Sequence, residues 1–245
     1  MLSVLNGLLE HANVAVPPAL DRALSRLGVT PNMHKMHHSR SIPRTVGWIL
    51  IAGSIVFWMG AVTPPYRQWM GVSLEEYLGI VGGNGRNWRA MHALFGLGAL
   101  LTLIGLSALT ARLRDHSSGT WAMIGVALLG VSTVLWLVQL GFRVVVTPWA
   151  SAELAATGRV PAQYGALHQW MGMLFGTHMV LGYLASAAYG FAVLGAPALP
   201  KWAGWTAVCF GLVAVPGLAT PVFQPPLMLE VVPFVLGLAI LRTSP

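Results

Sequence analysis

The chain has 245 residues, of which 56 % are hydrophobic and only 9 % are charged. About a quarter of the residues in a soluble domain are charged, so this composition excludes an ordinary soluble enzyme and predicts a membrane protein. The net charge of +7 does not indicate a nucleic-acid partner, because no basic run alternates with aromatic residues as a binding groove would require.

Residues 1–44 are the polar part of the chain, and we treat them as a cytoplasmic or interfacial domain. Pro17-Pro18 opens a short helical pattern that places three leucines on one face and two arginines on another. Such an amphipathic helix is typical of a segment that lies along the membrane surface. The first 20 residues hold no Lys or Arg, so we expect an uncleaved anchor rather than a secretory signal.

Three histidines near the end of this segment have the spacing of a metal site. His34, His37 and His38 stand at i, i+3 and i+4, so on a helix they project from one face. Together with His11-Ala12-Asn13, Pro17-Pro18 and Thr30-Pro31, the cluster resembles the third histidine box of the fatty acid hydroxylase and sterol desaturase superfamily. The resemblance covers about the first 40 residues. It implies an iron-ligand role for His34, His37 and His38, and a supporting role for His11.

Members of that family are membrane enzymes that hold two irons at the cytoplasmic face and use oxygen and electrons to hydroxylate or desaturate a lipid. The resemblance therefore implies an iron cofactor and a lipid substrate. The family's two earlier histidine boxes would lie upstream of Met1, so we expect the ligand set within this chain to be incomplete. A hydroxylase or desaturase of this kind would need a second protein chain to supply the missing ligands.

Residues 45–245 form a second domain, which we expect to be an all-α, polytopic membrane helix bundle. A crossing needs about 20 apolar residues. Six stretches meet this requirement, at roughly 45–62, 88–110, 121–146, 165–194, 202–220 and 221–241. Residues 63–87 form a longer loop with one short interfacial helix. Prolines between Pro216 and Pro233 interrupt the last two stretches, so a re-entrant pair is an alternative to two crossings.

The distribution of basic residues indicates the orientation of this bundle. With six crossings, nine of the 14 Lys and Arg residues fall on the side of the two termini and five on the other. Because basic loops stay preferentially in the cytoplasm, we expect a multi-pass protein of the inner (plasma) membrane with both termini cytoplasmic. Six tryptophans then fall at interface depth: Trp88, Trp149 and Trp170 outside, and Trp121, Trp202 and Trp205 inside.

Small residues four apart predict close helix contacts in the fourth crossing. The pairs are Gly172 with Gly176, and Gly182 with Ser186 and Gly190. His178 lies in the same stretch beside several methionines, but these residues do not share one helical face. Apolar packing is therefore favoured there over a Cu(I) site.

Four ionisable residues lie in the outer half of the predicted bundle: His92, Arg143, His168 and Glu230. Charges inside a membrane are costly and usually have partners. An ion pair between Arg143 and Glu230, with two histidines reaching the interface, is the structural interpretation. The functional interpretation is an outward-facing polar pocket for a small molecule or a proton. A haem ligated by His92 and His168 is a further alternative.

Three interpretations of function follow from these observations. The first is an integral membrane protein of unassigned role, in contact with membrane lipids, whose N-terminal histidine box is incomplete. The second is an iron-dependent lipid hydroxylase or desaturase completed by another chain. The third is a haem or small-molecule binder that uses the outer polar pocket. The sequence indicates neither a substrate nor an oligomeric state.

Overall fold

The computed structural model describes residues 42–66, 68, 71–114, 118–218 and 226–243. The residues from Ile42 onward form one compact unit. The histidine-box residues His11, His34, His37 and His38 lie outside the described residues, so their predicted role is not addressed by the structure.

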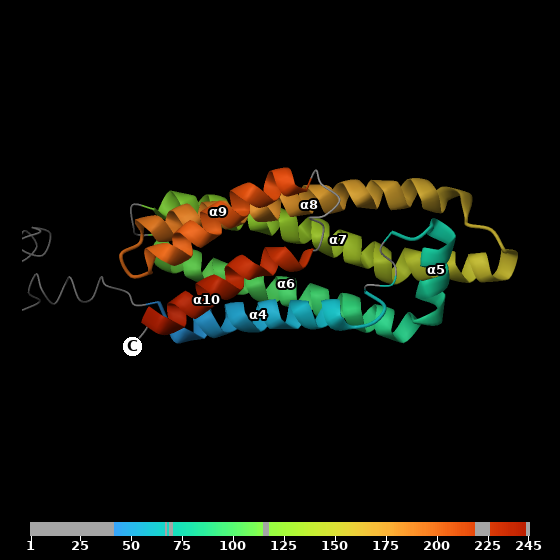
Figure 1. Ribbon diagram of the computed structural model, residues 1–245, viewed down its shortest axis with the longest axis horizontal. Helices are drawn as coiled ribbons and strands as arrows, with labels where there is room; N and C mark the ends of the chain where they lie inside the picture. The colour runs from blue at the N-terminus through green and yellow to red at the C-terminus, as the bar shows by residue number, and fades with distance from the viewer. Residues whose placement is uncertain (1–41, 67, 69–70, 115–117, 219–225, 244–245) are drawn as a thin grey trace, which may run out of the picture. The chain divides into compact units, whose positions relative to one another are not determined.

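Helices are the only regular secondary structure in the described part of the chain, which contains no strand, and this confirms the predicted all-α class. Its elements are α4 (Arg44–Val62), α5 (Leu74–Gly83), α6 (Gly85–Leu113), α7 (Gly119–Thr157), α8 (Ala162–Gly195), α9 (Lys201–Gly217), η1 (Pro226–Glu230) and α10 (Val231–Thr243). Helices α4, α6, α7 and α8 run side by side and alternate in direction (Figure 1).

Five described segments are long and apolar enough to cross a membrane: α4, α6, α7, α8 and the segment Pro226–Thr243. The unit is therefore a helical membrane domain. Helix α9, with 17 residues, is shorter than these five. It packs against α8 and lies beside α10 at the end of the bundle where α4 begins (Figure 1).

The segment before α10 reaches nearly as deep into the bundle as α4 does. The indole Nε1 of Trp58 donates a hydrogen bond to the carbonyl oxygen of Leu227 at 3.0 Å. Trp58 is about one helical turn from the end of α4 at Val62. The segment Pro226–Thr243 thus extends along most of α4.

Helices α7 and α8 are longer than a bilayer requires. Helix α7 has 39 residues, which corresponds to about 58 Å, whereas the hydrocarbon core is about 30 Å thick. Both helices continue past the end of α4, and α5 lies across the bundle beside them (Figure 1). The Ser151 hydroxyl donates to the Leu78 carbonyl oxygen at 2.6 Å and fixes α5 to α7.

Helix α5 is the short helix expected between the first two crossings. Its first turn follows a capping serine, because the Ser73 hydroxyl accepts a hydrogen bond from the Glu76 amide at 3.2 Å. Two acidic side chains, Glu75 and Glu76, lie in this first turn, where the helix dipole favours negative charge. These local signals begin α5 at Leu74.

Glycines set the close contacts between helices, partly as predicted. A Cβ atom at Gly190 would lie 2.6 Å from the Val208 amide nitrogen, and one at Gly182 would lie 2.8 Å from the Leu229 side chain. Both therefore occupy tight contacts, as expected. The prediction for Gly172 and Gly176 is wrong, because no atom lies within 4 Å of a Cβ built at either position.

One of the six predicted interfacial tryptophans is misplaced. Trp88 is fully buried, and its indole Nε1 donates to the carbonyl oxygen of Arg143 at 2.7 Å. The other five, Trp121, Trp149, Trp170, Trp202 and Trp205, are each at least 45 % exposed, as a position at the membrane interface requires. Trp88 is instead part of the core beneath α5.

Candidate functional site

A polar pocket lies where α5 meets α7 and α8, and we call it the α5 pocket. Its volume is about 360 Å³. Arg143 comes from α7, His168 and Gln169 come from α8, and Tyr77 comes from α5. Gly71, Val72, Ser73, Leu74 and Gly165 complete the lining. The pocket is therefore at the end of the bundle where α7 and α8 extend beyond α4 (Figure 1).

The Arg143 side chain is held against α5 in a half-buried position. Its Nη1 donates a hydrogen bond to the Tyr77 hydroxyl oxygen, and its guanidinium carbon lies 5.3 Å from the centre of the Tyr77 ring. Cation–π contact at this distance is favourable. The guanidinium charge is thus fixed at the pocket wall by a buried tyrosine.

The His168 imidazole contacts two aromatic rings. Its ring centre is 5.5 Å from that of Tyr77 and 5.7 Å from that of Tyr164. Tyr164 is itself anchored, because its hydroxyl donates to the Thr147 hydroxyl at 3.0 Å. The Nδ1 atom of His168 is buried without a hydrogen-bond partner among the described residues. An orphaned polar atom of this kind is unusual and is typical of a site that takes a ligand or water.

The lining of the α5 pocket favours an anion. None of the described residues that line it is acidic, whereas Arg143 brings a permanent positive charge. A guanidinium presents a planar fork of donors that matches a carboxylate or phosphate. This set of groups is suited to binding an anion.

The structure brings Arg143 and His168 together, as the predicted outer pocket requires, and places His92 beside them in the core. His92 is 6 % exposed, and its Nδ1 lies 2.7 Å from the Trp88 carbonyl oxygen. From His168 to His92, the rings of Tyr77 and Trp88 form a continuous series of tilted and edge-to-face contacts, with centres 5.5, 5.8 and 4.3 Å apart. Two buried rings between the imidazoles do not favour a haem that both would ligate.

Glu230 does not join this pocket. Its carboxylate oxygen Oε2 accepts a hydrogen bond from the Thr102 hydroxyl at 2.7 Å and lies 3.2 Å from the Ser54 hydroxyl. Ser54 is near the middle of α4, whereas Arg143 lies at the level of Trp88, close to α5. The structure therefore gives Arg143 and Glu230 separate partners rather than the expected ion pair.

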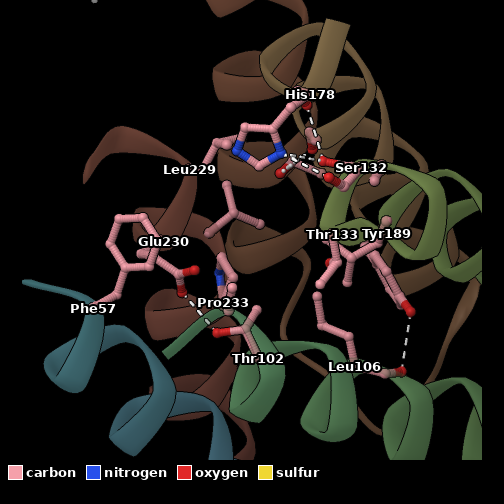
Figure 2. A pocket seen from close by; sticks show the side chains of 16 residues that line it. Phe57, Thr102, Leu106, Ser132, Thr133, His178, Tyr189, Leu229, Glu230 and Pro233 are labelled. Atoms are coloured by element: carbon pink, nitrogen blue, oxygen red, sulfur yellow. Dashed lines mark hydrogen bonds between the residues drawn. The ribbon is translucent and has the colours of Figure 1, made fainter. Parts of the chain in front are cut away.

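Glu230 instead lines a small interior cavity together with His178, as Figure 2 shows. The cavity has a volume of about 30 Å³, which is the space of roughly one water molecule. The sequence analysis interpreted His178 as a packing residue and did not predict its position at this cavity. The available signal was Gly182, one turn after His178 on the same face, which lines the same cavity.

Within the described residues, no group of three or more His, Cys, Asp and Glu side chains could hold a metal ion. Comparison with known proteins gives no match to a family model, a curated protein or a solved structure. The functional inference therefore rests on the geometry of the two polar sites.

Proposed function

We propose that this membrane protein binds a small organic anion, of the carboxylate class, in the α5 pocket. The observation that carries the proposal is the Arg143 guanidinium, fixed by Tyr77 at the wall of a 360 Å³ pocket that has no acidic lining residue among those described. Ligand pockets typically measure about 300–1,000 Å³. The α5 pocket is in the lower part of this range, which suits a small molecule.

Aromatic groups beside the charge support a carboxylate attached to a flat body. The Tyr77 ring lies against both the guanidinium and the His168 imidazole. Gln169 adds an amide at the exposed rim. A ligand whose carboxylate binds Arg143 and whose flat apolar part lies along these rings would make both a charged and an aromatic contact.

The orientation that we propose places this pocket on the outer side of the plasma membrane, with both termini in the cytoplasm. The excess of basic residues on the side of the termini supports this orientation. An outward pocket would bind solutes that have not crossed the bilayer. The protein would then act as a binding component for such solutes rather than as an enzyme.

Binding of benzoate to the purified full chain tests the proposal. Benzoate should change the intrinsic tryptophan fluorescence, because Trp88 is bonded to the backbone of Arg143. A charge-assisted hydrogen bond contributes about 1.5–3 kcal/mol, so Arg143→Gln should weaken binding about ten-fold or more. Arg159→Gln, a change of an exposed arginine between α7 and α8, should leave the affinity unchanged.

Two results would contradict the proposal. One is the absence of saturable benzoate binding to the wild-type protein, and the other is an equal loss in the Arg143 and Arg159 variants. Saturable binding of inorganic phosphate without any binding of benzoate would contradict the proposal that the ligand is a carboxylate. Gel filtration and thermal unfolding of each variant separate a loss of binding from a loss of folding.

We also propose that the N-terminal histidine box binds iron, as the family resemblance implies. The spacing of His34, His37 and His38 supports this role. Protein expressed with added iron should retain it, and replacing all three histidines by alanine should remove it, whereas His116→Ala should not. Wild-type protein without stoichiometric iron, measured alone and with any co-purifying chain, would contradict the proposal.

A further inference from the structure

The interior cavity holds two ionisable side chains that the proposed anion site does not use. Glu230 is 5 % exposed and His178 is 6 % exposed. Figure 2 shows them on opposite sides of the pocket, with Leu229 between them and Thr102 below the carboxyl group. Ionisable groups inside a membrane domain are rare because burying them is costly, and they commonly mark ion or proton sites.

The Glu230 carboxyl group is oriented by neutral donors. Thr102 of α6 donates to Oε2 at 2.7 Å, and the Ser54 hydroxyl of α4 lies 3.1 Å from the backbone oxygen of Glu230 and 3.2 Å from Oε2. No described residue donates a hydrogen bond to Oε1, and no described Lys or Arg forms an ion pair with the carboxyl group. Among the described residues, the site thus contains a carboxyl group with one hydrogen-bonded oxygen and no cationic partner.

The groups that face this carboxyl group from each helix are few. Helices α4, α6 and α7 contribute the hydroxyls of Ser54, Thr102, Ser132 and Thr133. Helix α8 contributes His178 and Tyr189, which are the other titratable groups that line the cavity. The Tyr189 hydroxyl is already engaged, because it donates to the Leu106 carbonyl oxygen at 3.0 Å. His178 is therefore the titratable group available to act with Glu230.

The His178 imidazole is held through Nδ1, whereas Nε2 has no hydrogen-bond partner among the described residues. Its Nδ1 lies 2.8 Å from the Ser132 hydroxyl oxygen, and its ring stacks on Trp136 with centres 4.8 Å apart. Its Nε2 is buried and has no hydrogen-bond partner among the described residues. A buried nitrogen without a described partner, on the wall of a cavity with room for one water molecule, favours a water-mediated contact.

We infer that Glu230 and His178 form a proton-binding site in the interior of the membrane domain, with cavity water as the carrier. A proton delivered as hydronium adds to the Glu230 carboxylate, which gives the neutral acid and leaves a water molecule, and release of the proton to that water regenerates the carboxylate and hydronium. The Nε2 atom of His178 accepts a hydrogen bond from that water. The site is separate from the α5 pocket, so either can fail without the other.

Infrared difference spectroscopy of the purified full chain tests this site. Changing the pH should produce a carboxylic acid C=O band that is absent from Glu230→Gln. Glu153→Gln, which changes an exposed carboxyl group on α7, should retain the band. A wild-type protein without a titrating band, or a band of equal size in Glu230→Gln, would overturn the proposal.

A second variant keeps the test valid if Glu230→Gln does not fold. Thr102→Val removes the 2.7 Å hydrogen bond to Oε2 and should shift the frequency of the C=O band. Thr206→Val removes only a bond to its own helix, from the Thr206 hydroxyl to the Trp202 carbonyl oxygen, and should leave the frequency unchanged. An unshifted band in Thr102→Val would contradict the assignment to Glu230. Loss of the band on adding Na⁺ at constant pH would show that the site binds a metal cation, and this result would overturn the proposal of a proton site.

Discussion

At the scale of single residues, Gly190 sets the distance between α8 and α9. A Cβ atom there would lie 2.6 Å from the Val208 amide nitrogen and 2.7 Å from the Gly204 carbonyl oxygen, and backbone atoms cannot rotate away. Overpacking of this kind costs about 1–3 kcal/mol, so Gly190→Ala should lower the thermal unfolding midpoint in detergent. Gly172→Ala in the same helix meets no atom and should unfold at or slightly above the wild-type temperature. Equal midpoints for the two variants would contradict this packing.

Residue types predicted part of the candidate site. The sequence analysis placed Arg143 and His168 in the outer half of the predicted bundle, and the structure brings them to one pocket. It could not predict Tyr77 as the partner of Arg143, because the position of α5 depends on tertiary contacts such as the bond from Ser151 to Leu78. Trp88 was misread for the same reason, since the packing of α5 buries it.

At the scale of helices, hydropathy predicted which segments exist but not where they end. The third crossing was expected at 121–146, whereas α7 continues to Thr157. Ala150 and Leu154 in the extension are apolar because they pack in the core beneath α5. An apolar side chain gives the same hydropathy whether it faces lipid or packed protein, so the end of α7 could not be derived from composition.

For helices α9 and α10, the sequence again predicted only part of the arrangement. The prolines between Pro216 and Pro233 indicated an interruption in this region, where α9 ends at Gly217 and the next described element is a 3-10 turn that begins at Pro226. The depth of the pair could not be derived, since it depends on contacts such as the bond from Trp58 to Leu227. The same break places Glu230 at the end of a 3-10 turn, where both its backbone oxygen and its carboxyl group meet Ser54.

At the scale of the whole molecule, the charge bias that sets the proposed orientation lies mostly outside the described helices. Five described basic residues are at the end where α4 begins: Arg44, Arg112, Arg114, Lys201 and Arg242. Four are toward the end that holds α5: Arg86, Arg89, Arg143 and Arg159. Five against four is a weak bias, so the orientation depends on the basic residues at positions 22, 26, 35 and 40.

Labelling of single cysteines in intact cells measures this orientation directly. The chain has one cysteine, Cys209, which is exposed and is first replaced by serine. Arg159→Cys places a thiol at the α5 end and Arg114→Cys places one at the opposite end, and both positions are exposed. With the α5 pocket outside, a membrane-impermeant maleimide should label Arg159→Cys in intact cells and Arg114→Cys only after permeabilisation. The reverse pattern would put the α5 pocket in the cytoplasm and make cytoplasmic anions, rather than external solutes, its ligands.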